Sequence, residues 1–153
     1  MKVYLVQHAE SKSKDVDPNR SLTEGGRQDT VKVAVLAARM GLDVHQIRHS
    51  GKTRAEQTAT ILGEALSPPD GVVEVSGLAP LDEVEPVADE LTKAAQPVML
   101  VGHLPFMERL AGQMLTGDLG SSVVQFRNAG IVCLMREERW QVAWIITPEI
   151  AAA

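Results

Sequence analysis

The arrangement of apolar residues constrains the fold of this chain more than any other feature, because short apolar runs alternate with longer amphipathic segments. Short runs of this kind are typical of buried strands, and the amphipathic segments are typical of helices. Strands are predicted at residues 3–6, 44–48, 72–75 and 98–101, and helices at residues 24–40, 51–67 and 83–95, with a further helix beginning near Pro105. This alternation predicts a mainly parallel sheet with helices on both faces.

The predicted helices carry signals at their ends and on their faces. Thr23 is expected to cap the first helix, Gly41 to end it, and Ser50 to cap the second helix. Three apolar side chains of the first helix share one face: Val31, Val35 and Ala38. Four side chains of the second helix are predicted to point inward: Ala55, Thr58, Ala59 and Leu62.

The C-terminal part of the chain has a different pattern. Residues 123–126, 131–136 and 140–146 are predicted strands with short connections, and Glu137 and Glu138 lie in a hairpin between the last two. These strands are expected to extend the sheet with antiparallel edges. We see no repeat or linker, so residues 1–153 are predicted to form one domain, an α/β fold of the three-layer α/β/α sandwich type.

Composition excludes some classes of function. The formal net charge of -5 argues against nucleic acid as the main partner, because binding a phosphate backbone requires a basic face. No apolar stretch approaches the roughly 20 residues that span a membrane, and none resembles a signal peptide, so we expect no membrane association and a cytoplasmic location. The single Cys133 is expected to be a buried core thiol.

Several polar residues follow the predicted strands. In a parallel sheet, ligands bind beyond the carboxyl ends of the strands. The first strand is followed by Gln7 and His8, the second by Ser50 with Arg54 in the next helical turn, and the fourth by His103. Two histidines and an arginine are therefore expected at one edge of the sheet.

Each of these residues also has an ordinary structural interpretation. A single histidine at a strand end is usually a hydrogen-bonded structural residue, although two at the ends of different strands are harder to dismiss. Lys52 and Arg54 lie in a first helical turn, where cations oppose the helix dipole. A bound anion would reverse that penalty, since the free N–H groups of the turn also favour negative charge. The alternative, in which both side chains point into solvent, stays open on spacing alone.

Four short motifs resemble those of the histidine phosphatase superfamily, which includes the phosphoglycerate mutases. Gln7-His8-Ala9 stands where the family has Arg-His-Gly, and residues 20–26, 50–59 and 102–105 are similar to the family's next three motifs in the same order. Serine, arginine, glutamine and threonine together in residues 50–59 are the most specific of these signals. The chain is most similar to the short phosphohistidine phosphatases of the SixA type.

The resemblance implies a role for each matching residue. His8 would be the nucleophile that becomes phosphorylated, and Arg54 would clamp the phosphate. His103 would be the second phosphate-binding histidine, and Arg20 would also reach the phosphate. Gln7 occupies the place of a phosphate-binding arginine, but an amide lacks the charge and the rigid fork of a guanidinium.

Other charged residues are weaker candidates. Lys12 and Lys14 could replace the charge that Gln7 lacks, although Arg20 is the better candidate. Asp82 and Glu83 are candidates for a general acid, and they are equally well explained as solvated residues at a helix start.

The expected function is a metal-independent phosphatase that acts on protein-borne phosphohistidine, for example on a histidine-transfer domain, through a phospho-His8 intermediate. Alternatives are a phosphatase for small phosphate esters, and a phosphate- or phosphohistidine-binding module with weak or no turnover because of Gln7. No cofactor is expected. No metal is expected either, because His45 and His49 have no adjacent carboxylate to complete a site. The phosphorylated partner and the oligomeric state stay open.

Overall fold

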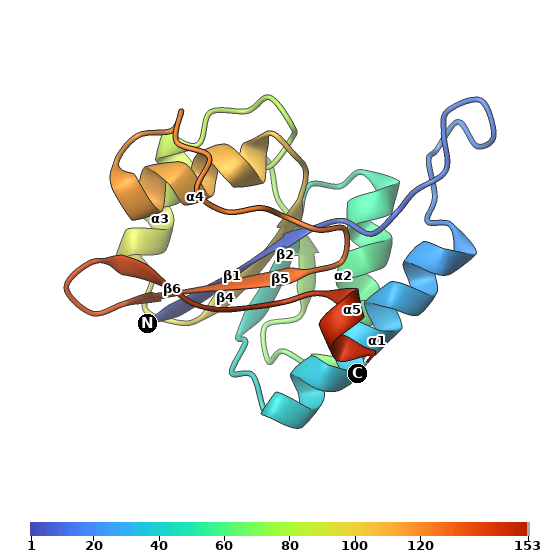
Figure 1. Ribbon diagram of the computed structural model, residues 1–153, viewed down its shortest axis with the longest axis horizontal. Helices are drawn as coiled ribbons and strands as arrows, with labels where there is room; N and C mark the ends of the chain where they lie inside the picture. The colour runs from blue at the N-terminus through green and yellow to red at the C-terminus, as the bar shows by residue number, and fades with distance from the viewer. Residues whose placement is uncertain (153) are drawn as a thin grey trace.

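The computed structural model describes residues 1–152, which form one six-stranded sheet with helices on both faces. In chain order the elements are β1 (Lys2–Gln7), α1 (Glu24–Met40), β2 (Gln46–His49), α2 (Thr53–Leu66), β3 (Val72–Glu74), α3 (Glu85–Lys93), β4 (Val98–Gly102), α4 (Phe106–Thr116), β5 (Ile131–Arg136), β6 (Trp140–Ile146) and α5 (Pro148–Ala151). The predicted three-layer α/β/α sandwich is confirmed (Figure 1).

The strand order of the sheet is β3-β2-β4-β1-β5-β6. The four strands from β3 to β1 are parallel, whereas β5 runs antiparallel to β1, and β6 runs antiparallel to β5. The predicted antiparallel extension at the C-terminal end is therefore confirmed. Because β4 lies between β2 and β1, the residues that follow these three strands are neighbours at one edge of the sheet.

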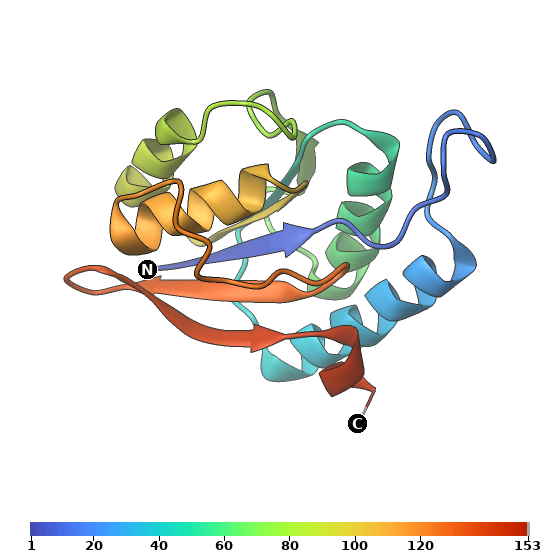
Figure 2. The ribbon, with the colours of Figure 1, turned by 45° about the horizontal axis from the view of Figure 1, so that its top comes forward.

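Two hydrophobic cores lie on opposite faces of the sheet. Side chains alternate between the faces of a strand, so Val3 and Leu5 of β1 pack with α3 and α4, whereas Tyr4 and Val6 pack with α1 and α2. Figure 2 shows α3 and α4 above the sheet and α1 and α5 below it. Buried on both faces, β4 is apolar throughout before Gly102, as expected of a central parallel strand.

Helix α1 begins and ends where the sequence predicts, but it buries a different face. The Thr23 hydroxyl accepts a hydrogen bond from the Gly26 backbone N–H, and Gly41 ends the helix at φ 68. Val31 and Val35 are exposed, at 48% and 43%, and the helix instead buries Thr30, Val33, Ala34 and Ala37. Both stripes are largely apolar, so the pattern along the helix did not determine which one would face the sheet.

Two other predictions are wrong. Residues 123–126 are not a strand: Val124 and Phe126 are buried in the core beside α4, but the segment pairs with none of the six strands. Ser50 does not cap α2, whose N-cap is Lys52. The Ser50 hydroxyl lies 2.7 Å from the His103 Nε2 and also accepts from the Lys52 N–H, which precedes the helix.

The structure also tests three predictions, two about buried side chains and one about membrane-spanning helices. The four side chains of α2 that were predicted to point inward are buried. Cys133 is a buried thiol, and burial raises its pKa to about 11. Within residues 1–152, no helix is long and apolar enough to span a membrane.

Candidate functional site at the carboxyl edge of the sheet

Two histidines and a serine meet at the carboxyl edge because of the strand order. His8 follows β1, Ser50 follows β2, and His103 follows the strand between them. The His103 Nε2 lies 2.7 Å from the Ser50 hydroxyl, and the rings of His103 and His8 have centroids 5.1 Å apart. The structure thus brings together the residues that the sequence places after separate strands.

His8 is fixed in one orientation by its neighbours. Its backbone N–H donates to the Gly102 carbonyl at 2.9 Å, and its backbone carbonyl accepts from the Asn128 side chain at 2.8 Å. Its ring Nδ1 lies 2.7 Å from the Ala9 carbonyl oxygen. A carbonyl can only accept, so Nδ1 carries the proton and the lone pair of the neutral ring is on Nε2.

Arg54 reaches His8 from the first turn of α2. Its Nε lies 3.3 Å from the His8 Nε2, so the arginine donates to the lone pair that Nδ1 protonation leaves. Gly51, at φ 90, makes the turn between β2 and α2, and a Cβ there would lie 2.6 Å from the Glu74 carboxyl carbon. This turn points the N-terminus of α2, and with it Arg54, at the histidines.

His103 is almost completely buried. It is 1% exposed, and in the described part of the chain its Nδ1 has no hydrogen-bond partner. Burial, followed by the neighbouring His8, Arg54, Lys52 and Arg20, lowers its pKa to about 3. His103 is therefore neutral near pH 7.

Cations dominate the electrostatics of this edge, although the whole chain is acidic. Burial lowers the pKa of His8, the bond to the Ala9 carbonyl opposes this, and the charges of Arg54 and Arg20 lower it again. Burial and Arg20 also lower the pKa of Arg54. Like charges held together in a half-buried place favour binding of an anion that neutralises them.

Arg20 lies close enough to act on the site but is held by its own loop. Its Nε donates to the Lys12 carbonyl at 3.2 Å, and its second guanidinium nitrogen donates to the Ser11 hydroxyl at 3.1 Å. Its backbone is in the left-handed region, at φ 51, which is uncommon for a residue other than glycine. The loop is anchored to α2, because the Gln57 side chain accepts from the Leu22 N–H at 2.7 Å.

Gln7 is tied down through its backbone only. Its carbonyl accepts from the Ala129 N–H at 2.9 Å, whereas its side chain makes no hydrogen bond within residues 1–152. Alternation along β1 places that side chain on the face of Leu5, under α3 and α4. The amide therefore lies at the carboxyl end of β1 without a hydrogen-bond partner among residues 1–152.

The two candidate acids do not contact the histidines. Asp82 accepts a hydrogen bond from the Ala79 N–H at 2.9 Å, and Glu83 is exposed. Arginine, lysine and histidine are the charged groups that lower the pKa of His8 and His103. The two carboxylates therefore fit the structural interpretation, as residues at the start of α3.

Two further residues bind the backbone around His8, and sequence reasoning gave them no role at the site. Asn128 donates to the His8 carbonyl from the far end of the chain, and nothing in the local sequence indicates this. Thr58 accepts from the Ala9 N–H at 3.0 Å. The position of Thr58 in the motif of residues 50–59 could have indicated a role at the site. Its spacing with the apolar Ala55, Ala59 and Leu62 favoured a buried structural role instead.

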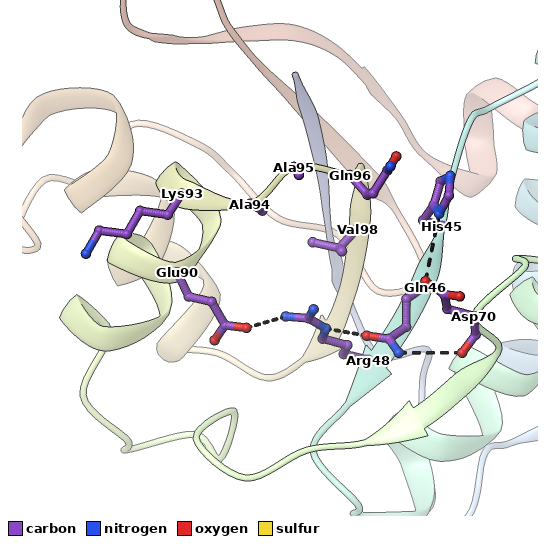
Figure 3. Close-up of a pocket in the computed structure, with 10 residues that line it drawn as sticks. All are labelled: His45, Gln46, Arg48, Asp70, Glu90, Lys93, Ala94, Ala95, Gln96 and Val98. Atoms are coloured by element: carbon purple, nitrogen blue, oxygen red, sulfur yellow. Dashed lines mark hydrogen bonds and ion pairs between the residues drawn. The ribbon is translucent and has the colours of Figure 1, made fainter.

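The opposite edge of the sheet holds a separate hollow of about 420 Å³, at the amino ends of β2 and β4 (Figure 3). Two of its basic side chains face carboxylates: Arg48 lies 2.7 Å from Glu90, and His45 lies 3.8 Å from Asp70. Residues 1–152 include no group of three or more His, Cys, Asp or Glu side chains placed to hold a metal ion.

The chain combines a mainly parallel six-stranded sheet with two histidines at its carboxyl edge. No family model matches the chain, and no curated protein gives a significant match. Solved structures do match: the protein histidine phosphatase SixA complexed with tungstate is 22% identical with a TM-score of 0.84, over 97% of each chain. A protein from Agrobacterium tumefaciens assigned as phosphohistidine phosphatase SixA is 26% identical with a TM-score of 0.79, over 95% of this chain and 97% of that one.

A more distant neighbour has a different substrate. A mutant phosphoserine phosphatase from Entamoeba histolytica, in complex with phosphoserine, is 15% identical with a TM-score of 0.71, over 97% of this chain and 98% of that one. The resemblance to the histidine phosphatase superfamily that the motifs predict is confirmed by these neighbours.

Proposed function

We propose that the protein is a phosphatase in which His8 attacks phosphorus. The observation that carries this proposal is the orientation of the His8 ring, whose Nδ1 faces the Ala9 carbonyl and whose Nε2 lone pair faces Arg54. A neutral imidazole is a competent nucleophile near pH 7, and the lowered pKa of His8 keeps it neutral there.

In the first step the Nε2 lone pair forms a bond to phosphorus as the bond to the leaving group breaks. The Arg54 guanidinium then moves its hydrogen bonds from Nε2 to the phosphoryl oxygens, where charge gathers in the transition state. His103 and Arg20 add donors around the same oxygens. In the second step water attacks phosphorus, the P–N bond breaks, and His8 is returned with inorganic phosphate.

The substrate that fits best is phosphohistidine carried by another protein. A phosphate ester needs a proton donor for its leaving oxygen, and no carboxylate in the described chain forms a hydrogen bond or an ion pair with His8 or His103. The imidazole of a phosphohistidine can take its proton from water and then leaves readily. The SixA neighbours point to the same substrate.

Two alternatives are separated from this proposal by one experiment. The purified protein is given a phosphorylated histidine-transfer domain and p-nitrophenyl phosphate in parallel, with and without EDTA. Turnover of the first alone supports the proposal, turnover of the second at a similar rate supports a small-ester phosphatase, and binding without turnover supports a module disabled by Gln7.

The covalent step is tested by acid quenching during turnover. Labelled phosphate should be trapped on His8, and EDTA should leave the rate unchanged because we propose no metal in the reaction. Activity that EDTA removes and a divalent ion restores would contradict the mechanism.

A further inference from the structure

The hydrogen bonds around His8 close into a ring. The Arg54 Nε donates to the His8 Nε2, and the His8 Nδ1 donates to the Ala9 carbonyl. The Ala9 N–H donates to the Thr58 hydroxyl, which in turn donates to the Arg54 carbonyl at 2.8 Å. The ring therefore joins the end of β1 to the first turn of α2 at two points, one through side chains and one through Thr58.

Thr58 differs from the three other helix threonines that donate to the carbonyl four residues earlier. Thr30, Thr60 and Thr116 also donate to the carbonyl four residues earlier, which is a common local bond for threonine. Among these four in residues 1–152, Thr58 alone also accepts from a part of the chain far away in sequence. Its side chain is 0% exposed, and its bond to the Ala9 N–H is buried.

The two links of the ring do not survive the reaction equally. When the His8 Nε2 bonds to phosphorus, it can no longer accept from Arg54, so the side-chain link breaks. The link from Ala9 through Thr58 to the Arg54 backbone is untouched by that step. During the chemical steps, therefore, Thr58 is the member of this ring that still links the helix carrying Arg54 to the turn carrying His8.

We propose that Thr58 is a positioning residue that sets the distance between the His8 ring and the Arg54 guanidinium while phosphorus is bound. This proposal rests on the function proposed above. Thr58 touches neither phosphate nor leaving group, and it acts through the backbones of Ala9 and Arg54. A displacement of the order of 1 Å between reacting groups can cost about a hundredfold in rate.

The test compares three variants. Thr58→Val keeps the shape but loses the hydroxyl, Thr58→Ser restores it, and Thr30→Val is the matched control. Thr30 is also 0% exposed and makes the same local bond, to the Gly26 carbonyl at 2.7 Å, away from the histidines. We expect Thr58→Val to lower kcat about tenfold to a hundredfold with little change in KM. Thr58→Ser should recover most of kcat, and Thr30→Val should keep it while both valine variants lower the melting temperature.

A second measurement does not depend on turnover. Nitrogen-15 NMR of the histidine rings should show the wild-type His8 as the Nδ1–H tautomer, and Thr58→Val should shift it towards a tautomer mixture while Thr30→Val does not. If the wild type turns over no substrate, the proposed function fails. The NMR measurement still tests whether Thr58 maintains the hydrogen-bonded ring around His8. A wild-type His8 in the Nε2–H tautomer, or a Thr58→Val protein with normal kcat and tautomer, would overturn the role of Thr58.

Discussion

The two edges of the parallel sheet carry similar residues in opposite electrostatic states. At the amino edge, Arg48 and His45 each face a carboxylate, from Glu90 and Asp70 (Figure 3). At the carboxyl edge, the arginines surround two neutral histidines, and the structure shows no ion pair to them among the described residues. Charges that are already paired stabilise the fold, whereas charges without a counterion make a site ready for an anion.

The largest expected effect is at His8. His8→Ala should abolish turnover, because the Nε2 lone pair is the proposed nucleophile. The fold should persist, since the backbone N–H and carbonyl of residue 8 keep their bonds to Gly102 and Asn128. Turnover assays check the first point and circular dichroism checks the second. Wild-type turnover by the variant would show that His8 is not the nucleophile.

Arg54 should have the next largest effect. We expect Arg54→Ala to lose about a hundredfold or more in kcat/KM, as for one preorganised donor at the developing charge. Lys52→Ala is the matched variant, because Lys52 is the N-cap of the same helix and no hydrogen bond joins its side chain to His8 in residues 1–152. Its loss should be much smaller, and equal losses would show that the clamp is assigned to the wrong residue.

Gln7 and Arg20 decide how the missing arginine is replaced. We expect Arg20 to supply the charge, because it already lowers the pKa of His8 and of Arg54. Arg20→Ala should therefore be nearly as damaging as Arg54→Ala, and Gln7→Arg should change kcat/KM little. A gain of about tenfold or more from Gln7→Arg, together with a silent Arg20→Ala, would show a slow enzyme or a binding module instead.

The pH dependence of activity tests whether His8 is neutral when it attacks. His8 must be neutral to attack, and its pKa lies below the ordinary 6.5 because of burial and two arginines. The kcat/KM should hold as pH falls through 6.5 and decline only below it, whereas in Arg54→Ala the decline should begin at higher pH. A wild-type decline that begins above pH 6.5 would contradict a buried neutral nucleophile.

The pH dependence of stability should report on His103. Its pKa is about 3 when folded and 6.5 ordinarily, so the unfolded chain takes up this proton first. The free energy of unfolding should therefore fall as pH drops from 6.5 towards 3. His103→Gln should lose that part of the slope, as measured by urea unfolding at several pH values.

The smallest effects are expected at the amino edge. Arg48→Ala and Glu90→Gln break an ion pair in which the Glu90 side chain is largely exposed, so each should cost about 1 kcal/mol or less of stability. Neither should change kcat/KM. A loss of activity from either variant would show that the amino edge and the carboxyl edge are coupled.

Much of the fold was predictable from local patterns. The apolar runs of β1, β4, β5 and β6 and the ends of α1 follow from spacing and caps. Residues 123–126 were mistaken for a strand because Val124 and Phe126 alternate as strand residues do, yet they are buried in a connection. In α1, the apolar pattern did not distinguish the stripe that is exposed from the stripe that is buried, because one helix can carry two apolar stripes.

By itself, the sequence determined which residues would follow each strand, because strand length and apolar pattern are local properties of the chain. It thereby placed His8, Ser50 and His103 at the carboxyl edge of a parallel sheet. Only the tertiary structure decided that β4 lies between β1 and β2, and so which of these side chains touch. It alone also decided the tautomer of His8 and the bond from Ala9 to Thr58, because hydrogen bonds between distant residues depend on ångström-scale positions that packing sets.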